Sequence, residues 1–575
     1  MKNLKIYIVP VLFIISNLLS AQETKKILHQ AMEQEISRNI QNLHLEGMKD
    51  PFYIGLNIVD FNMLGIHSSL GALIRINESP VRTTFNNQVL VGDYDNNNLN
   101  YADAKSSGYF FRTIGSLPLD NSLQEIQRAL WLSFDKGYKL SAEIYESKQS
   151  ALKTRTQTDD IAGLPDYLKG EKVLIEKPEI SLKFNNEKLI QYANEISLLF
   201  KSYRFITDSW VKIIGYRANV YYSNTEGSKA TYPASVLRLA VNIKTQASNG
   251  EILELFEVYH SIDETGLPAK DQVIKEARAM AESLAVLKDA PVFDDVYNGP
   301  VLFEDQAASE AVRKTMFNPR SENLYSARNP ITGGTSGQSS QTKISTDDRI
   351  DKKVSTEGLN VSARSTMTEY NGIKLLGSYP VDMDGTVPPT EITLIENGML
   401  KNLLCGRIPT RKMKVSNGHL RVSFGMPIPR IVPGVIEVDF KNSLPKEEMK
   451  KKLIEMAQEE GLDYGLIVRE ITPNISELKM VYKVDIKTGK EELFRSAGFK
   501  GLTYNDMRKI VDAGNQKRVL NTTAGDDPQH NSDYINGCPA TFITPDAFLF
   551  KDLEINKLNR PILNKLPVVK NPLEL

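Results

Sequence analysis

The chain has 575 residues, more than one hydrophobic core usually serves, so two or more domains are expected. Its 70 Lys and Arg residues almost balance 71 Asp and Glu residues, which leaves a net charge of −1. Binding to nucleic-acid phosphates needs a basic surface, so this balance argues against DNA or RNA as a partner.

The N-terminus has the pattern of a secretory signal peptide. Two lysines among the first five residues precede an apolar run over 6–19, and the small residues Ser20 and Ala21 follow. We predict a signal peptide over 1–21 and a periplasmic or secreted mature protein. The alternative is an uncleaved anchor. The run is shorter than the roughly 20 residues of a membrane span, and no later segment reaches that length, so no stable membrane insertion is expected after cleavage.

The first half of the chain predicts an antiparallel sheet with long helices. Between residues 50 and 120, short apolar runs alternate with turn-rich polar stretches, as antiparallel strands do. Asn249-Gly250 separates two runs of alternating polarity, which predicts a β-hairpin over 237–260. Apolar residues at helical spacing predict three helices, over 122–153, 187–203 and 270–287. The acidic, Pro-containing stretch after the third helix predicts a boundary between a domain over 22–295 and one over 296–575.

The second half is predicted to be mainly β. Asn397-Gly398 and Thr488-Gly489 are hairpin signals with β-rich flanks, and one helix is expected over 446–460. Neither half shows the alternation of strand and helix that a doubly wound parallel sheet requires. The fold class is therefore predicted to be α+β, with two domains.

Cys405 and Cys538 are the only cysteines, so at most one disulfide can form. Cys405 lies in a predicted buried strand and Cys538 in a Gly-Cys-Pro turn. We favour two free thiols.

Several segments, spread over most of the chain, carry a resemblance to a known family. The most informative is YNGPVLFEDQAASEAVRKTMFNP, from Tyr297 to Pro319. The others are PFYIGLNIVD (51–60), LGALIRINESPVRTTFNNQVLVGDYDNNN (70–98), ALWLSFDKGYKLSAEIYESKQSAL (129–152), NVYYSNTEG (219–227), GTVPPTEITLIENGMLKNLL (385–404), the MPIPR run ending at Arg430 and GCPATFITPDAFLFKDLEI (537–555). Together they resemble exported members of the TldD/PmbA family of metallopeptidases. The resemblance implies a C-terminal barrel-like domain and a cleft between the two domains.

The resemblance also implies where a zinc site would lie. The family's HExxxH positions fall on Ser309, Glu310 and Lys314, and Cys538 lies close to the family's Cys ligand. Glu310 would be the general base. A catalytic zinc ion normally has three protein ligands, and a Ser hydroxyl is a poor one. The Lys314 ammonium opposes the binding of a dication. No cofactor is therefore expected, unless the site has been rebuilt for zinc.

Other interpretations of these residues stay open. Glu310 fits an acid on the solvent side of a helix, paired with Arg313 or Lys314, and Cys538 fits a buried turn residue. A rebuilt site could use Glu304, Asp305 and His530 with Cys538. Against this, Glu304 and Asp305 suit the start of the helix, through capping and the helix dipole.

Arg421 and Arg430 resemble family positions that border the substrate cleft. If that role carries over, they bind a peptide through charge-assisted hydrogen bonds. The alternative is that both form ordinary surface ion pairs.

These observations predict an exported, non-catalytic subunit that binds peptides in the cleft and pairs as a homodimer or with a second family member. The main alternative is an active zinc metallopeptidase that cleaves small or unstructured peptides at a rebuilt metal site. A third is a periplasmic binding or assembly protein that makes no contact with peptides.

Overall fold

A computed structural model describes residues 5–103, 115–154, 163–317, 324–332, 347–423, 425, 428–471, 477–498, 502–525 and 531–558. For residues 5–22 and for residue 86 it describes the backbone alone. Residues 5–21 of the segment predicted as a signal peptide lie at the start of helix α1 (Lys5–Asn42). In this described part, no helix is both long and apolar enough to cross a membrane.

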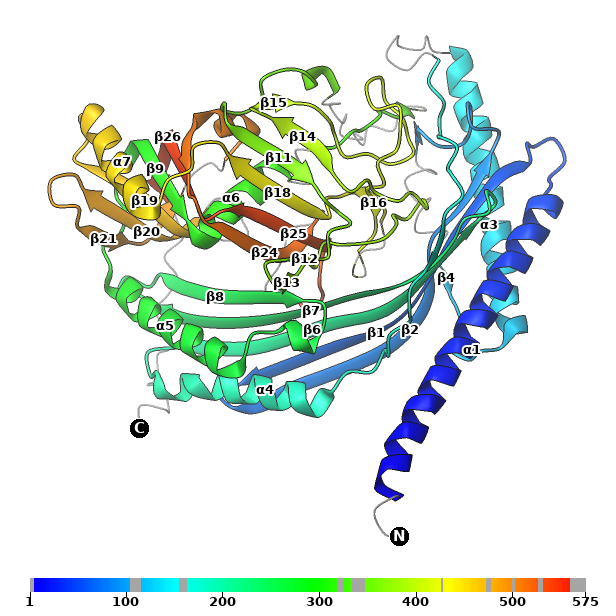
Figure 1. Cartoon of the computed structure of the whole chain (residues 1–575), viewed down its shortest axis with the longest axis horizontal. Coiled ribbons are helices and arrows are strands. Elements are labelled where there is room, and N and C mark those ends of the chain that lie inside the picture. The colour runs from blue at the N-terminus through cyan, green and yellow to red at the C-terminus, as the bar shows by residue number, and fades with distance from the viewer. Residues whose placement is uncertain are drawn as a thin grey trace.

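The described residues of the first half form a long seven-stranded sheet. Its order is β4-β2-β1-β6-β7-β5, and β8 pairs with the remaining length of β7. All neighbours are antiparallel except β5, which runs parallel to β7. The strands are β1 (Pro51–Ser69), β2 (Ala72–Val91), β4 (Gly115–Ser116), β5 (Leu174–Glu176), β6 (Asp208–Asn224), β7 (Lys229–Gln246) and β8 (Ile252–Ser261). The predicted strands between 50 and 120 and the hairpin over 237–260 are confirmed. Figure 1 shows a curved layer whose hollow side faces the C-terminal half.

Helices cover the other side of this sheet. Helices α1 and α3 (Leu123–Thr154) pack at one end, and α4 (Asn186–Leu198) and α5 (Lys270–Asp289) pack at the other (Figure 1). A short 3₁₀ turn, η2 (Leu199–Ser202), extends α4. The helices predicted over 122–153, 187–203 and 270–287 are therefore confirmed.

Strands β1, β6 and β7 are buried along most of their length and carry apolar side chains on both faces. On β1, Ile54, Leu56 and Ile58 contact the core beneath α1 and α3, whereas Val59 and Phe61 contact the core shared with the C-terminal half. Successive side chains of a strand point to opposite faces of the sheet, so β1 contributes apolar side chains to two separate cores.

The C-terminal half contains a closed barrel and a second sheet. Strands β19-β9-β26-β22-β20 pair in this order, and a β19–β20 pairing closes the ring. Beside it, the described strands β15-β14-β11-β18-β25-β24 form a six-stranded sheet. The bounds are β9 (Val296–Glu304), β11 (Leu359–Ala363), β14 (Ile392–Glu396), β15 (Met399–Leu400), β18 (Val435–Phe440), β19 (Tyr464–Ile471), β20 (Glu477–Asp485), β21 (Glu491–Phe494), β22 (Ala497–Gly498), β23 (Ile510–Ala513), β24 (Lys517–Ala524), β25 (Cys538–Pro545) and β26 (Ala547–Lys557). The α+β class and the barrel-like C-terminal half are confirmed.

Two helices belong to this half. Helix α6 (Asp305–Met316) packs against β19 and β25, and α7 (Lys446–Glu459) packs on the barrel, which confirms the helix predicted over 446–460. Short strands complete the described part: β3 (Tyr101–Ala102), β10 (Ile331–Thr332), β12 (Glu369–Tyr370), β13 (Ile373–Lys374), β16 (Leu420–Arg421) and β17 (Arg430–Ile431). The predicted boundary at residue 295 lies between the end of α5 and the start of β9.

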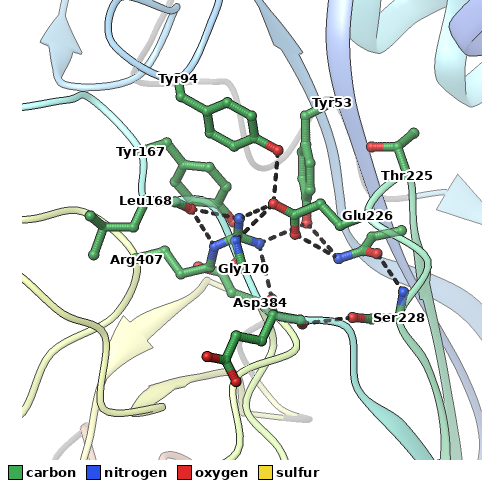
Figure 2. A network of polar contacts seen from close by, with 12 residues as sticks. Tyr53, Tyr94, Tyr167, Leu168, Gly170, Thr225, Glu226, Ser228, Asp384 and Arg407 are labelled. Carbon is green, nitrogen blue, oxygen red and sulfur yellow. Dashed lines mark hydrogen bonds and ion pairs between the residues drawn. The ribbon is translucent and has the colours of Figure 1, made fainter.

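A buried ion pair joins the two halves. Glu226, in the turn between β6 and β7, accepts a hydrogen bond of 2.6 Å from Arg407 of the C-terminal half. The Arg407 guanidinium also donates to the Leu168 carbonyl at 2.6 Å and lies 4.1 Å from the centre of the Tyr167 ring (Figure 2). The Arg407 and Glu226 side chains are 2% and 6% exposed, so both charges have lost their water.

Arg407→Met should destabilise the protein by about 3–5 kcal/mol, because it leaves the Glu226 carboxylate buried and unpaired. Urea unfolding measures this loss. Lys139→Met is the matched control, because Lys139 pairs with Asp135 at 2.7 Å but its side chain is 54% exposed. This substitution should lower the unfolding free energy by less than about 1 kcal/mol. Equal losses in the two variants would contradict the structural role of the buried pair.

Candidate functional site

Helix α6, which carries the family's zinc-motif positions, is wedged between the barrel and the six-stranded sheet. It follows directly on β9, and its first residue, Asp305, has the left-handed backbone angle φ of 52°. Every residue from Ala307 to Met316 is buried. The small side chains of Ala307, Ala308 and Ala311 permit this close packing.

The two acids at the start of α6 do not cap it. Glu304 makes no side-chain hydrogen bond to the helix and instead pairs with Arg469 of β19 at 2.8 Å. Asp305 pairs with Lys446 at 2.6 Å. The predicted side-chain cap is wrong, because cations of β19 and α7 compete for these carboxylates.

Ser309, at the position of the family's first His, contributes to packing. Its side chain is fully buried, and its hydroxyl lies 2.8 Å from the Thr544 hydroxyl of β25. The two hydroxyls satisfy each other, which avoids the cost of burying an unpaired polar group.

Glu310 is held by cations of its own helix. Its Oε2 accepts hydrogen bonds from Arg313 Nε at 3.0 Å and Nη2 at 2.8 Å, and the Lys314 ammonium lies 3.7 Å away. The predicted pairing is confirmed, because a spacing of three or four residues places these side chains on one helix face. The predicted solvent exposure is wrong, since all three residues are buried. Burial alone would raise the pKa of Glu310, but Arg313 and Lys314 outweigh it and lower that pKa.

A pocket of about 300 Å³ lies at Glu310 and Arg313. Strand β8 of the first sheet and strand β24 of the six-stranded sheet contribute to its walls, and each is an edge strand. His260 of β8 interacts electrostatically with Glu310 and Arg313. Burial and then Arg238 lower the pKa of His260 to about 3, so its ring is neutral at pH 7. The sequence shows His260 as an isolated residue, and no motif links it to α6.

Unlike Glu310, the acid Glu470 in this pocket is protonated at neutral pH. Burial, followed by the charge of Glu257, raises the pKa of Glu470 to about 8. One oxygen of Glu470 is buried without a hydrogen-bond partner in the described part of the chain. The pocket therefore offers a neutral carboxyl group and a neutral imidazole, beside the ion cluster of α6.

Cys538 lies at the opposite end of β25 from the residue that contacts Ser309. It is the first residue of β25, whereas Thr544, which contacts Ser309, is six positions further along. At about 3.3 Å per residue, the two strand positions are roughly 20 Å apart. Cys538 and Cys405 are both buried and free, in agreement with the prediction of two free thiols.

The residues present do not fit a catalytic zinc ion. The Ser309 hydroxyl and the Glu310 carboxylate are already engaged, and Lys314 brings a positive charge. Within the described ranges, no three His, Cys, Asp or Glu side chains gather as metal ligands would. His530, proposed for a rebuilt site, lies outside the described residues.

Arg421 and Arg430 face each other across the short β16–β17 pairing. Arg421 donates to the Pro433 and Pro539 carbonyls at 2.8 and 2.7 Å, and Arg430 donates to the Gly525 carbonyl at 2.6 Å. Arg421 is buried, so the alternative of a surface ion pair is wrong for this residue. It also lines a second cavity, of about 610 Å³, between the sheet and the C-terminal half.

The fold defines a two-part protein, with a long antiparallel sheet in its first half and a β-barrel beside a second sheet in its C-terminal half. Residues 297–556 match the model of the PmbA/TldA metallopeptidase C-terminal domain. This region, the C-terminal half of the chain, belongs to the TldD/PmbA family.

Solved structures share the fold. TldE from Thermococcus kodakarensis matches with a TM-score of 0.55 at 12% identity, over 92% of this chain and 100% of that chain. A Thermotoga maritima protein described as a modulator of a DNA gyrase gives the same values. A Bacteroides thetaiotaomicron protein with a similar description matches with a TM-score of 0.54 at 11% identity, over 93% of this chain and 99% of that chain. A search of curated proteins found no match.

Glu310→Gln should destabilise the protein by roughly 3 kcal/mol at pH 7, because Arg313 and Lys314 lose their counter-charge in a buried place. The pKa of Glu310 is lower in the folded state than in the unfolded state. The carboxylate therefore adds its full contribution to the unfolding free energy above the unfolded-state pKa of about 4.3, and this contribution is lost as the pH falls through the folded-state pKa. Urea unfolding of wild type and variant from pH 7 to pH 3 tests this.

The expected difference in unfolding free energy is constant down to about pH 5 and shrinks below about pH 4. Glu125→Gln is the control, because Glu125 is 60% exposed and lies 3.9 Å from Arg128. A difference for Glu310→Gln that stays unchanged to pH 3 would show that the carboxylate charge does not stabilise the fold.

Proposed function

We propose that the chain is an exported, non-catalytic member of the TldD/PmbA family that binds unstructured peptides at the pocket between β8 and β24. The observation that carries this proposal is the state of Glu310, which stands in the family's catalytic position but is paired with Arg313 and Lys314. A general base must accept a proton near neutral pH, and the lowered pKa of this carboxylate opposes that.

The two edge strands favour a peptide as the ligand. The outer edges of β8 and β24 have no strand partner among the described residues, and the strands lie side by side at the pocket. An extended peptide can add to such an edge through main-chain hydrogen bonds, which need no metal ion.

Arg518 of β24 provides a polar contact for the peptide. It is exposed, lines the pocket and forms no ion pair with the carboxylates of the described chain. Its guanidinium can donate to peptide carbonyls or to a terminal carboxylate.

Export and pairing complete the proposal. The N-terminal lysines, apolar run and small residues support secretion to the periplasm or beyond. A partner, either a second copy or another family member, would supply the peptidase activity that this chain lacks.

Arg518→Met should weaken peptide binding by roughly tenfold, because it removes a charged donor from the pocket. Fluorescence anisotropy with a labelled unstructured peptide measures the affinity. Lys551→Met is the control, because Lys551 is equally an exposed cation but does not line the pocket. Identical affinities for wild type, Arg518→Met and Lys551→Met would reject this binding site.

Elemental analysis distinguishes the proposal from the active metallopeptidase. The mature protein, isolated without chelators or a His-tag, should contain far less than one zinc ion per chain and should not cleave the same peptide. A Cys538→Ala variant should give the same result. Near-stoichiometric zinc that disappears in Cys538→Ala would overturn the proposal and support a rebuilt metal site.

A further inference from the structure

The cavity of about 610 Å³ between the first sheet and the C-terminal half is separate from the α6 pocket. Its floor is the hollow side of the sheet, with Val59, Phe85 and Val220, and its opposite wall includes Leu376, Val381 and Met383. The two cavities share no lining residue. A cavity of this size, with mostly apolar walls, is typical of a small-molecule site.

The largest polar side chains of the walls already have hydrogen-bond partners, whereas the buried Ser235 hydroxyl has none among the described residues. Asp382 Oδ1 accepts hydrogen bonds from the Asp384 and Thr386 amides at 3.0 and 2.9 Å, and its Oδ2 accepts one from Leu420 at 3.1 Å. Arg421 donates to two main-chain carbonyls, and the Tyr379 hydroxyl donates to the Gly418 carbonyl at 2.7 Å. These groups hold the wall together, so the cavity presents mainly hydrocarbon to a ligand.

One charged group at the rim is different. Lys177 directly follows β5, and its backbone amide donates a hydrogen bond to the Thr231 carbonyl at 2.8 Å. This bond continues the pairing of β5 with β7 by one residue, so Lys177 lies beside Tyr232. Neighbours in register point to the same side of a sheet, so Lys177 shares the hollow side with Tyr232. Lys177 is exposed and lines the cavity.

The acids near Lys177 in the sequence are engaged elsewhere. Glu176 pairs with Lys25, and Glu179 accepts a hydrogen bond from Tyr221. Lys177 forms no ion pair with any carboxylate of the described residues, and the Tyr232 hydroxyl has no hydrogen-bond partner among them. The cavity therefore combines an unpaired ammonium at its rim with the buried Tyr232 hydroxyl, on which the charges of Asp382 and Arg421 also act.

We propose that this cavity binds a small amphiphilic monocarboxylate, whose apolar body lies between Val220 and Met383 and whose carboxylate meets Lys177 and Tyr232. The apolar walls take up hydrocarbon that water excludes, and the ammonium at the rim supplies the complementary charge. This site goes beyond the proposed peptide binding and does not depend on it.

Decanoate and decanol are the probes, because they share an apolar chain and differ in the head group. Isothermal titration calorimetry below the micelle-forming concentration should give saturable binding of one decanoate per chain. Ala234→Trp fills the cavity, since Ala234 stands on the same side of β7 as Tyr232, and should weaken binding at least roughly tenfold. Val286→Trp, at an exposed site on α5 outside the cavity, is the control and should bind as wild type does.

Lys177→Met tests the head group and lies at an exposed position where folding is not at risk. It should weaken decanoate binding about fivefold and leave decanol binding unchanged, whereas Lys177→Arg should retain the wild-type affinity for decanoate. The proposal is overturned if wild type shows no saturable decanoate binding, if correctly folded Ala234→Trp binds normally, or if Lys177→Met weakens both probes equally.

Discussion

The architecture depends on one constraint: the central strands of the long sheet, β1, β6 and β7, carry apolar side chains on both faces, so each face must be covered. Helices cover one side, and the C-terminal half covers the other. This second contact brings edge strand β8 against edge strand β24 and encloses the outward face of α6. The Arg407–Glu226 ion pair joins the two halves at a different point of the same contact. Both interdomain cavities lie within this contact, which forms because the apolar face of the sheet has to be buried.

Helix α6 carries a buried ion cluster built entirely from its own residues. The negative charge of Glu310 is balanced by the positive charges of Arg313 and Lys314. This pairing keeps the buried carboxylate neutralised, which the low-dielectric surroundings demand.

Local patterns in the sequence predicted much of the fold. The helical spacing of Ile126, Leu130, Phe134 and Tyr138 identified α3, and all four residues are buried. The spacing of Glu310, Arg313 and Lys314 likewise predicted their pairing. Their burial was missed because the cover comes from β8, about 50 residues earlier and in another sheet. His260 and Arg518 were missed for the same reason, since neither belongs to a local motif. The contacts of Arg421 were also beyond prediction, because its partners are main-chain carbonyls brought together by the tertiary fold.

The shared core beneath the hollow side of the sheet has a consequence for the order of folding. Its first members, Val59 and Phe61, lie more than 300 residues before Leu376, Val381 and Met383, which cover them. During synthesis from the N-terminus, the sheet can pair its strands and collect its helices, yet this face stays exposed until the later segment emerges. Contacts this distant in sequence slow folding. The nascent first half therefore presents an apolar surface to solvent until the segment around residue 380 emerges, and binding by a chaperone would protect it from aggregation.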